Sequence, residues 1–510
     1  MTAAYDAIVV GSGPNGLAAA ITLAEQGRAV LVLEARPIPG GAVATEELTL
    51  PGFLHDTFSA VYPAAVASPV FSRMPLERFG LRWAHPPIAM AHPLPNGKAA
   101  ALYRDVERTV DNLERLAPGD GRRWREFIAP YLKHYRAMRD ILLGSFPPIG
   151  GAVRLLAGRG LDGSLEFARL VLLSATALTS ELFESAGAAA WLYGSSLHAD
   201  VPLDGAGSAI GGVYLLLLGH AVGWPSPAGG AGNLARALVR YLESMGGQVR
   251  VNTPVVRVLV ERGRVAGVAT AQGERFTAPV VIGDVTPRGL LHLAGDALPT
   301  RYAAQLRRYR YGEPSFKIDW ALAGPVPWEA AEARQAGTLH LGGPANELLH
   351  SHYMQRAEQM PDYPFMLVGQ QSLADPVRAP AGQHTLWGYT HPPRSTNYAT
   401  DHERIIERME NHIERYAPGF RKLILARHTL APADLERSNQ NLIGGDVGGG
   451  SYAFDQLVFR PVVSLLPYRT PIAGLYIGSA ATFPGAAVHG IGGGAAARLA
   501  LLEGRVRRWW

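Results

Sequence analysis

The stretch Asp6-Ala-Ile-Val-Val-Gly-Ser-Gly-Pro-Asn-Gly16 decides the fold of this 510-residue chain. Tyr5–Val10 is apolar and β-branched, which predicts a buried parallel strand. Gly11, Gly13 and Gly16 follow in the pattern G-x-G-x-x-G. The first glycine permits a tight turn, the second lets a pyrophosphate approach the backbone, and the third allows a helix to pack closely on the strand. The loop is therefore predicted to bind a dinucleotide through Gly11, Ser12, Gly13, Pro14, Asn15 and Gly16.

The residues after this loop complete a βαβ unit. Leu17–Gln26 is rich in alanine and contains no helix breaker, so it is predicted to be a helix with Gly27 at its C-terminal cap. The N-terminus of such a helix offers free N–H groups and a positive dipole end to phosphates. Ala29–Leu33 reads as the second strand and ends at Glu34, which is placed to bind a ribose hydroxyl. Because strand, loop, helix, strand and acid agree, we prefer this interpretation to a simple glycine-rich turn.

A glycine pair soon after Glu34 distinguishes between dinucleotides. Ala35-Arg36-Pro-Ile-Pro-Gly40-Gly41-Ala42 resembles the same region of the large flavoproteins with two dinucleotide-binding domains. The resemblance implies FAD as the cofactor, not NAD, with a second close approach of the backbone to it. The cofactor contacts that it implies here are Glu34, Ala35, Arg36, Gly40, Gly41 and Ala42.

Composition limits the remaining classes of function. The chain is long enough for two domains, and 47% apolar and 18% charged residues indicate a globular protein. The net charge is only +5, and its many arginines are scattered, which argues against a nucleic-acid-binding surface. The chain has no cysteine, which excludes disulfides, thiolate catalysis and the disulfide-reductase branch of flavoproteins. His350, His352, His384 and His391 lack the spacing of metal ligands, so no metal site is predicted.

Neither a targeting segment nor a membrane span is expected from the sequence. The first strand begins within a few residues of Met1, which leaves no room for a signal peptide, and a cytoplasmic location is expected. The uncharged stretch Gly205–Ala235 has an apolar core, Ile210–Leu218, that is too short to span a membrane. A buried helix beside an apolar cavity is predicted there instead.

A more specific resemblance begins at residue 48. Leu48–Phe71, Gly80–Trp83 and Pro87–Pro93 resemble the phytoene desaturase-related flavoproteins, particularly the branch similar to pyridine nucleotide-disulfide oxidoreductase domain-containing protein 2. The resemblance covers nearly the whole chain. It implies an α/β fold: a Rossmann-like FAD-binding domain of the glutathione-reductase/amine-oxidase type with an interleaved α+β substrate or cap domain. The expected FAD-binding segments are 1–70, 225–300 and 465–510, and the cap segments are 71–224 and 301–464.

Three segments leave alternatives open. Asp105–Leu142 has helical periodicity, and Ile149–Leu178 carries apolar stretches with arginines at intervals. Helices of this kind are expected to cap the flavin, and they either pack on the domain core or rest on a membrane surface. The basic tail Gly504–Trp510, with two tryptophans, is similarly either a contact with a membrane interface or a frayed terminus.

The middle of the chain predicts the second half of the FAD domain. Leu234–Glu243 reads as a helix, and the strands expected after it are Gly247–Val251, Val255–Val260, Val265–Thr270 and Phe276–Ile282. Alone this order indicates a β-meander. By the resemblance, the main chain at Val255 meets the adenine ring.

The C-terminal signature is the second anchor of the resemblance. A strand, Leu475–Ile477, leads through a loop to a helix predicted over Gly492–Leu502. The resemblance places this loop under the isoalloxazine ring and the helix N-terminus at its pyrimidine edge, where a positive helix end stabilises reduced flavin. The cofactor contacts implied here are Gly478, Ser479, Pro484, Gly485, His489, Gly490 and Ile491. Phe483 and His489 depart from the usual family pattern.

The histidines of these motifs are the candidate bases. His489 either faces the flavin or is a hydrogen-bonded loop histidine, and both interpretations stay open. His55 is either structural, orienting a loop near the flavin, or a base. The Gly-rich segment Asn439–Ser451, with Arg460-Pro461 after it, resembles a family loop near the substrate cavity.

These observations predict an FAD-dependent oxidoreductase of the phytoene desaturase-like kind, which dehydrogenates a hydrophobic, isoprenoid or lipid-like small molecule by hydride transfer to flavin N5. No second nucleotide fingerprint is present, so oxygen, a quinone or another acceptor is expected to take the electrons. The alternatives are a flavin amine oxidase, a redox-neutral polyene isomerase and a non-catalytic lipid-binding relative like the Rab GDP-dissociation inhibitors. Amine oxidases commonly carry Arg where this chain has Ala42. The oligomeric state stays open.

Overall fold

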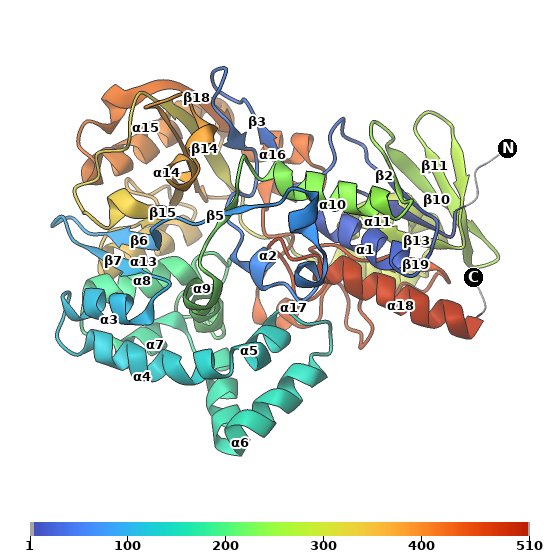
Figure 1. Cartoon of the computed structure of the whole chain (residues 1–510), viewed down its shortest axis with the longest axis horizontal. Coiled ribbons are helices and arrows are strands. Elements are labelled where there is room, and N and C mark those ends of the chain that lie inside the picture. Colours follow the sequence, from blue (N-terminus) through green and yellow to red (C-terminus); the bar gives the residue numbers. More distant parts are fainter. Residues whose placement is uncertain (1–4, 508–510) are drawn as a thin grey trace.

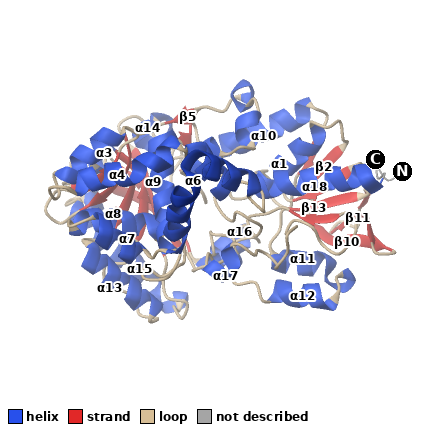
Figure 2. Ribbon diagram, turned by 90° about the horizontal axis from the view of Figure 1, so that it is seen from below, coloured by secondary structure: helices blue, strands red, loops and turns tan. Residues whose placement is uncertain are grey.

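The computed structural model describes residues 5–507 and contains two large sheets at opposite ends of the molecule (Figures 1 and 2). The first is a five-stranded parallel sheet in the order β19-β13-β1-β2-β9. Its strands are β1 (Ala7–Val10), β2 (Val30–Leu33), β9 (Gln248–Arg250), β13 (Val280–Gly283) and β19 (Leu475–Ile477). All five come from the segments predicted to bind FAD.

Both faces of the parallel sheet are covered, which explains its apolar strands. Ala7 and Val9 face one layer of helices, and Ile8 and Val10 face the other side. The helical layer contains α1 (Pro14–Ala24), α10 (Gly232–Ser244) and α18 (Ile491–Arg507). The opposite layer contains β10 (Val255–Glu261), β11 (Arg264–Thr270), β12 (Arg275–Thr277), α11 (Pro287–Ala294) and α12 (Thr300–Arg307).

Two differences from the sequence prediction have a clear physical cause. Helix α1 begins at Pro14 and not at Leu17, because proline at the first helical position is compatible with helix geometry. The predicted strand Phe276–Ile282 is wrong as a single element. It is divided at Pro279 into β12, which pairs antiparallel with β11, and β13, which pairs parallel with β1.

The second sheet is mixed and has seven strands in the order β18-β14-β17-β16-β15-β6-β7. Among its strand pairs within residues 5–507, only that of β15 with β6 is parallel. Its strands are β6 (Ile88–Pro93), β7 (Ala99–Leu102), β14 (Phe316–Leu322), β15 (Ala336–Leu341), β16 (Met366–Gly369), β17 (His384–Thr390) and β18 (Ile424–Leu430). One face packs on α15 (Tyr398–Tyr416).

The other face of this sheet packs on a group of helices (Figure 1). The helices of this region are α3 (Val106–Glu114), α4 (Asp120–Lys133), α5 (Tyr135–Leu142), α6 (Ile149–Leu172), α7 (Ala175–Leu182), α8 (Ala186–Ser196) and α9 (Ser208–Val222). Helix α9 covers the predicted buried apolar segment. No helix in the described part of the chain is long and apolar enough to cross a membrane.

Short elements join these layers. They are β3 (Thr45–Glu46), β4 (His55–Asp56), α2 (Pro63–Ala67), β5 (Trp83–Ala84), β8 (Ser226–Pro227), α13 (Ala345–Arg356), α14 (Gln371–Ala374), α16 (Pro432–Ser438) and α17 (Phe454–Leu457).

Helix α6 projects from the body of the molecule (Figure 1). It is kinked at Gly160, and six large aliphatic side chains on it are more than half exposed: Ile149, Val153, Leu156, Leu161, Leu165 and Leu172. This helix therefore does not bury a full apolar stripe against the core. The two tryptophans of the C-terminal tail lie outside the described residues, while Gly504–Arg507 continues α18.

Candidate functional site

The glycine loop between β1 and α1 is closely surrounded by backbone. A Cβ added to Gly16 would lie 2.1 Å from the carbonyl oxygen of Gly11, so the helix and strand touch there. A Cβ on Gly41 would lie 2.9 Å from the Cα of Gly13, and Gly41 has a φ of +56°. The Gly40–Gly41 turn therefore rests directly on the glycine loop, and both present bare backbone, as a dinucleotide site requires.

Glu34 lies at the end of β2 and is buried beside this loop. Its carboxylate accepts hydrogen bonds from the Ser12 N–H (2.9 Å), the Ser12 hydroxyl (2.6 Å) and the Arg36 N–H (2.9 Å). The Ser12 oxygen in turn accepts from the Gly40 N–H at 3.1 Å. The predicted ribose acid, the glycine loop and the glycine pair are thus joined in one network, and the residues present fit an FAD adenosine and pyrophosphate.

The structure also brings Val255 to this end of the sheet. The Thr253 N–H donates to the Glu34 carbonyl at 2.8 Å, and the Asn252 N–H donates to the Arg36 carbonyl at 3.0 Å. Val255 begins β10 directly after this junction. The contact of Val255 with the adenine ring stays a prediction.

Asp284 is a site residue whose role the sequence did not predict. Its carboxylate accepts from the Gly16 N–H at 3.0 Å and lies 2.4 Å from the position of a Cβ on Gly13. It reaches the loop because β13 and β1 are parallel neighbours whose ends meet at one edge. Burial, with Glu34 nearby, raises the pKa of Asp284 to about 7. In the sequence, the only sign of this residue was an acid just after a predicted strand.

The C-terminal loop reaches the same edge. A Cβ on Gly493, in the first turn of α18, would lie 1.7 Å from the carbonyl oxygen of Asn15. The Ser479 hydroxyl donates to the Val285 carbonyl at 2.7 Å, next to Asp284. The start of α18 therefore packs on the start of α1, and the loop 478–491 continues the surface formed by the glycine loop.

His489 is held by backbone on both ring nitrogens. Its Nδ1 accepts from the Ile491 N–H at 3.1 Å, and its Nε2 donates to the Ala486 carbonyl at 3.1 Å. Burial lowers the pKa of His489 to about 4, so the ring is neutral. The geometry is that of the hydrogen-bonded loop histidine, and it leaves no free nitrogen for a substrate proton.

His55 belongs to a buried charge network that joins β4 to β14 of the seven-stranded sheet. His55 Nδ1 lies 3.5 Å from Asp319 Oδ1, and its Nε2 lies 2.8 Å from the Thr49 hydroxyl. Lys317 Nζ donates to Asp319 Oδ1 (2.6 Å) and to the Asp56 carbonyl (3.1 Å). Although burial alone would raise the pKa of Asp319, the Lys317 ammonium and His55 hold it below its usual range. The network also pairs Arg378 with Asp56 and Asp375.

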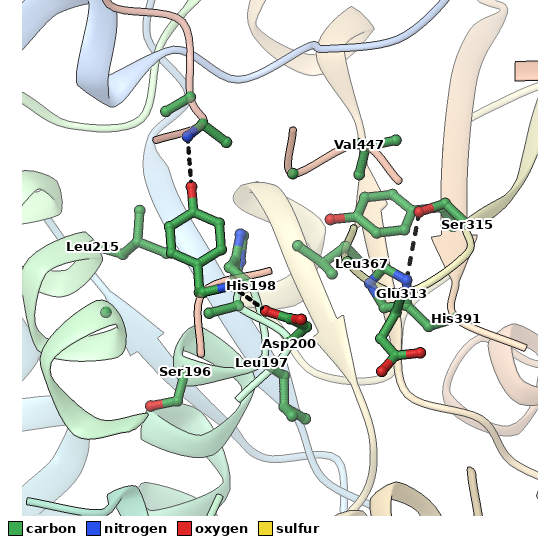
Figure 3. Close-up of a pocket in the computed structure, with 18 of the residues that line it drawn as sticks. Ser196, Leu197, His198, Asp200, Leu215, Glu313, Ser315, Leu367, His391 and Val447 are labelled. Carbon is green, nitrogen blue, oxygen red and sulfur yellow. Dashed lines mark hydrogen bonds between the residues drawn. The ribbon is translucent and has the colours of Figure 1, made fainter. Parts of the chain in front are cut away.

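A cavity of about 450 Å³ lies between the C-terminal loop and the seven-stranded sheet (Figure 3). Ala42 and Pro484, both predicted cofactor contacts, lie in its wall, as do Ala486, Ala487 and Val488. Much of the wall is apolar, with side chains from α9, the sheet and the end of α5: Leu143, Ile210, Leu215, Leu218, Phe365 and Leu367. Lys317 of the buried charge network lines the cavity, whereas His55 and His489 do not.

Asp200, Glu313 and His391 line another part of the cavity wall (Figure 3). His391 Nδ1 donates to the Pro314 carbonyl at 3.0 Å, and burial lowers the pKa of this ring, so it is neutral. The Tyr452 N–H donates to Asp200 at 2.6 Å, while the Tyr452 hydroxyl accepts from the Ala486 N–H at 2.8 Å. Tyr452 thus connects the polar wall to the C-terminal loop.

Comparison with known proteins agrees with this geometry. The family model described as flavin containing amine oxidoreductase matches residues 15–491. The rat protein called pyridine nucleotide-disulfide oxidoreductase domain-containing protein 2 is 28% identical, with 97% of this chain and 93% of that protein covered. A limonene dehydrogenase chain of Castellaniella defragrans is 25% identical (99% and 96% covered), and the lycopene-forming phytoene desaturase of Pseudescherichia vulneris is 24% identical (97% and 98%).

Solved structures support the fold. An oxidoreductase from Methanosarcina mazei superposes with a TM-score of 0.65 at 17% identity, covering 98% of this chain and 99% of that one. Putrescine oxidase bound to putrescine gives 0.58 at 16% identity, with both chains fully covered. The FAD cofactor and the resemblance to phytoene desaturase-related proteins are confirmed. The chain therefore belongs to the flavin-containing amine oxidoreductase family, and it is an FAD-dependent oxidoreductase of the amine oxidase and phytoene desaturase superfamily.

Proposed function

We propose that this protein dehydrogenates a hydrophobic, isoprenoid or lipid-like small molecule. The observation that carries the proposal is the cavity of about 450 Å³, whose wall is largely aliphatic and aromatic and includes the Pro484–Val488 loop. A cavity of this volume and lining suits a small apolar molecule oriented by a few polar groups. Limonene dehydrogenase and phytoene desaturase, named for apolar isoprenoids, are similar over almost the whole chain.

The cofactor residues proposed are those that the structure gathers at one edge of the parallel sheet. Glu34 binds the ribose, the Gly11–Gly16 loop and the start of α1 bind the pyrophosphate, and the loop before α18 supports the flavin. Bound FAD supplies the hydride acceptor. The cavity wall then has to hold one C–H bond of the substrate against that acceptor and keep water away from it.

Lys317 is the residue proposed to act on the substrate side. Its ammonium is fixed by Asp319 and the Asp56 carbonyl and lines the cavity. Lys317 therefore provides a hydrogen-bond donor at a fixed position in the cavity wall. His55 is proposed to orient this pair through Asp319.

The test is anaerobic reduction of the FAD-loaded protein by candidate substrates. A polyene precursor or a cyclic monoterpene is expected to bleach the flavin absorbance, and subsequent addition of oxygen or a quinone is expected to restore it. NADPH is expected to leave the absorbance unchanged. If no apolar substrate bleaches the flavin and amines do, this proposal is wrong and amine oxidation takes its place.

A second candidate, amine oxidation, is favoured by one observation. Asp200 and Glu313 place two carboxylates in the cavity wall, beside the neutral acceptor nitrogen of His391. Such a wall attracts a substrate that carries an ammonium group. Hydrophobic amines therefore belong in the same reduction assay, and D200N and E313Q should weaken their binding selectively.

Contact with a membrane surface and a cytoplasmic location are also proposals. The exposed aliphatic face of α6 supports membrane contact, since α6 packs on α5 and α9, which adjoin the cavity wall. Exposed apolar surface of this kind marks an interaction site, and a lipid bilayer is the occupant that also holds an apolar substrate.

A further inference from the structure

Arg460, three residues after α17, is a completely buried cation. Its guanidinium carbon lies 5.8 Å from the centre of the Tyr309 ring and 5.3 Å from that of Tyr452. A charge without contact to water needs strong partners in the protein or in a ligand.

The polypeptide within residues 5–507 satisfies only one of its three nitrogens. Nη2 donates to the Tyr309 hydroxyl (2.6 Å), the Gly449 carbonyl (2.9 Å) and, at 3.4 Å, the Gly450 carbonyl. Nε and Nη1 are buried without a hydrogen-bond partner. In the same described range, no carboxylate forms an ion pair with Arg460. The acid that faces it, Asp446, accepts instead from the N–H groups of Gly312, Gly448 and Gly450.

The unpaired edge of Arg460 adjoins the C-terminal loop. Nη1 lies 2.6 Å from the position that a Cβ would take on Gly485, whose φ of +114° also favours glycine. Pro484 and Ala486, on either side of Gly485, line the cavity. The same loop leads into α18, whose first turn packs on Asn15 of the glycine loop. A dinucleotide extending from Glu34 past the glycine loop would therefore reach this loop with its flavin end.

We propose that Arg460 is the fixed positive charge that stabilises reduced FAD in this protein. The inference rests on the family's FAD cofactor and the proposed position of the flavin at the C-terminal loop, and it is independent of the substrate. With FAD bound, dehydrogenation of the substrate would transfer a hydride, two electrons with one proton, to the cofactor, and the substrate would release its second hydrogen to water as a proton. The ring system then holds one extra negative charge unless it takes up a second proton. A buried cation behind the loop favours the charged form.

A purely structural role makes a different prediction. Arg460 also links Tyr309 and the Gly449–Gly450 backbone to the loop, so its removal perturbs the loop even if charge is irrelevant. The reduction potential of bound FAD separates the two roles, because it responds to charge and needs no substrate.

The first measurement uses the wild-type FAD-loaded protein. Its midpoint potential is titrated against a reference dye between pH 6 and 8. Uptake of one proton per two electrons gives a slope of roughly 30 mV per pH unit, since a tenfold change in a two-electron equilibrium corresponds to about 30 mV. We expect this slope. A slope of roughly 60 mV means that the reduced flavin takes up a second proton and carries no charge, which would overturn the proposal.

The second measurement compares variants. R460M should lower the equilibrium constant for reduction about tenfold, or about 30 mV, as expected for loss of one nearby charge. R460K keeps the charge and should stay within about threefold of wild type, as should Y309F, which removes only a hydrogen-bond partner. R310M, at an exposed arginine paired with Asp455, is the matched control. Equal shifts in Y309F and R460M would assign Arg460 a structural role. If R460M does not fold, R460Q takes its place, and a potential of R460Q within about threefold of that of R460K would overturn the proposal.

Discussion

Replacing Asp284 by Asn should make FAD binding independent of pH. The carboxyl of Asp284 lies at the first turn of α1, bonded to the Gly16 N–H, where the pyrophosphate is proposed to bind. Its pKa of about 7 means that it is protonated at pH 6 and ionised at pH 8. An ionised carboxylate repels the pyrophosphate, whereas the protonated form does not. The sign is therefore fixed: FAD affinity falls as pH rises through 7.

The magnitude follows from the fraction of protonated carboxyl. For a pKa of about 7, this fraction falls from about 0.9 at pH 6 to about 0.1 at pH 8. If only the protonated form binds well, the dissociation constant of wild type rises about tenfold over this range, equivalent to about 1.4 kcal/mol. Asn has the shape of the protonated acid and still accepts from Gly16. D284N should therefore match wild type at pH 6 and bind FAD about tenfold more tightly at pH 8.

The assay is equilibrium titration of FAD with the FAD-free protein at five pH values from 6 to 8. Quenching of the flavin fluorescence reports binding. D296N, the same substitution at an exposed aspartate just after α11, serves as the control and should retain the wild-type pH dependence. Glu34 is the other acid that faces Asp284, and it is unchanged in both variants. Equal wild-type affinities at pH 6 and 8, or a pH dependence that survives in D284N, would refute the reasoning.

Three further perturbations test other parts of the structure. K317M leaves the Asp319 carboxylate buried without its ammonium partner and should lower the free energy of unfolding by about 3–5 kcal/mol. The double variant K317M/D319N should recover most of that loss. Urea denaturation midpoints of both variants measure the two effects. G16A places a Cβ 2.1 Å from the Gly11 carbonyl oxygen and should abolish FAD binding, measured as the flavin content of purified protein. G150A, also in a helix but where a Cβ meets no atom within 4 Å, should retain it. L161E/L165E on α6 should reduce co-flotation of the protein with vesicles of phosphatidylglycerol and phosphatidylcholine at least tenfold. V377E, at another exposed position, should not reduce it. Unchanged flotation of L161E/L165E would count against membrane contact.

The cofactor half of the fold was predictable because its signals are local. The strand, glycine loop and helix at residues 5–26 follow directly from periodicity and glycine spacing, and the structure has them within a few residues. Helix α9 was predicted from a run of apolar residues too short to span a membrane, and the structure places it beside the cavity.

The chemistry of the cavity was not predictable in the same way. Lys317 and Asp319 lie in a strand that looks like any buried strand, and His55 meets them only because β4 packs against β14. Arg460 appeared only as part of a family-like loop, and its missing partners are a property of the packed state. His489 was singled out because it departs from the usual family pattern. That departure identified an unusual residue, but it did not predict the backbone hydrogen bonds of the ring. The strand pairing across Pro279 likewise depended on partners far away in the sequence.

The parallel sheet has a consequence for biosynthesis. Strand β19 and helix α18 are translated after all the other described elements, yet β19 pairs with β13, and α18 covers the alanine-rich face of α1. Until those residues leave the ribosome, β13 has an open edge and α1 an uncovered apolar surface. The nascent chain should therefore depend on chaperones until late in synthesis, and it can acquire its flavin only after the C-terminal helix has docked.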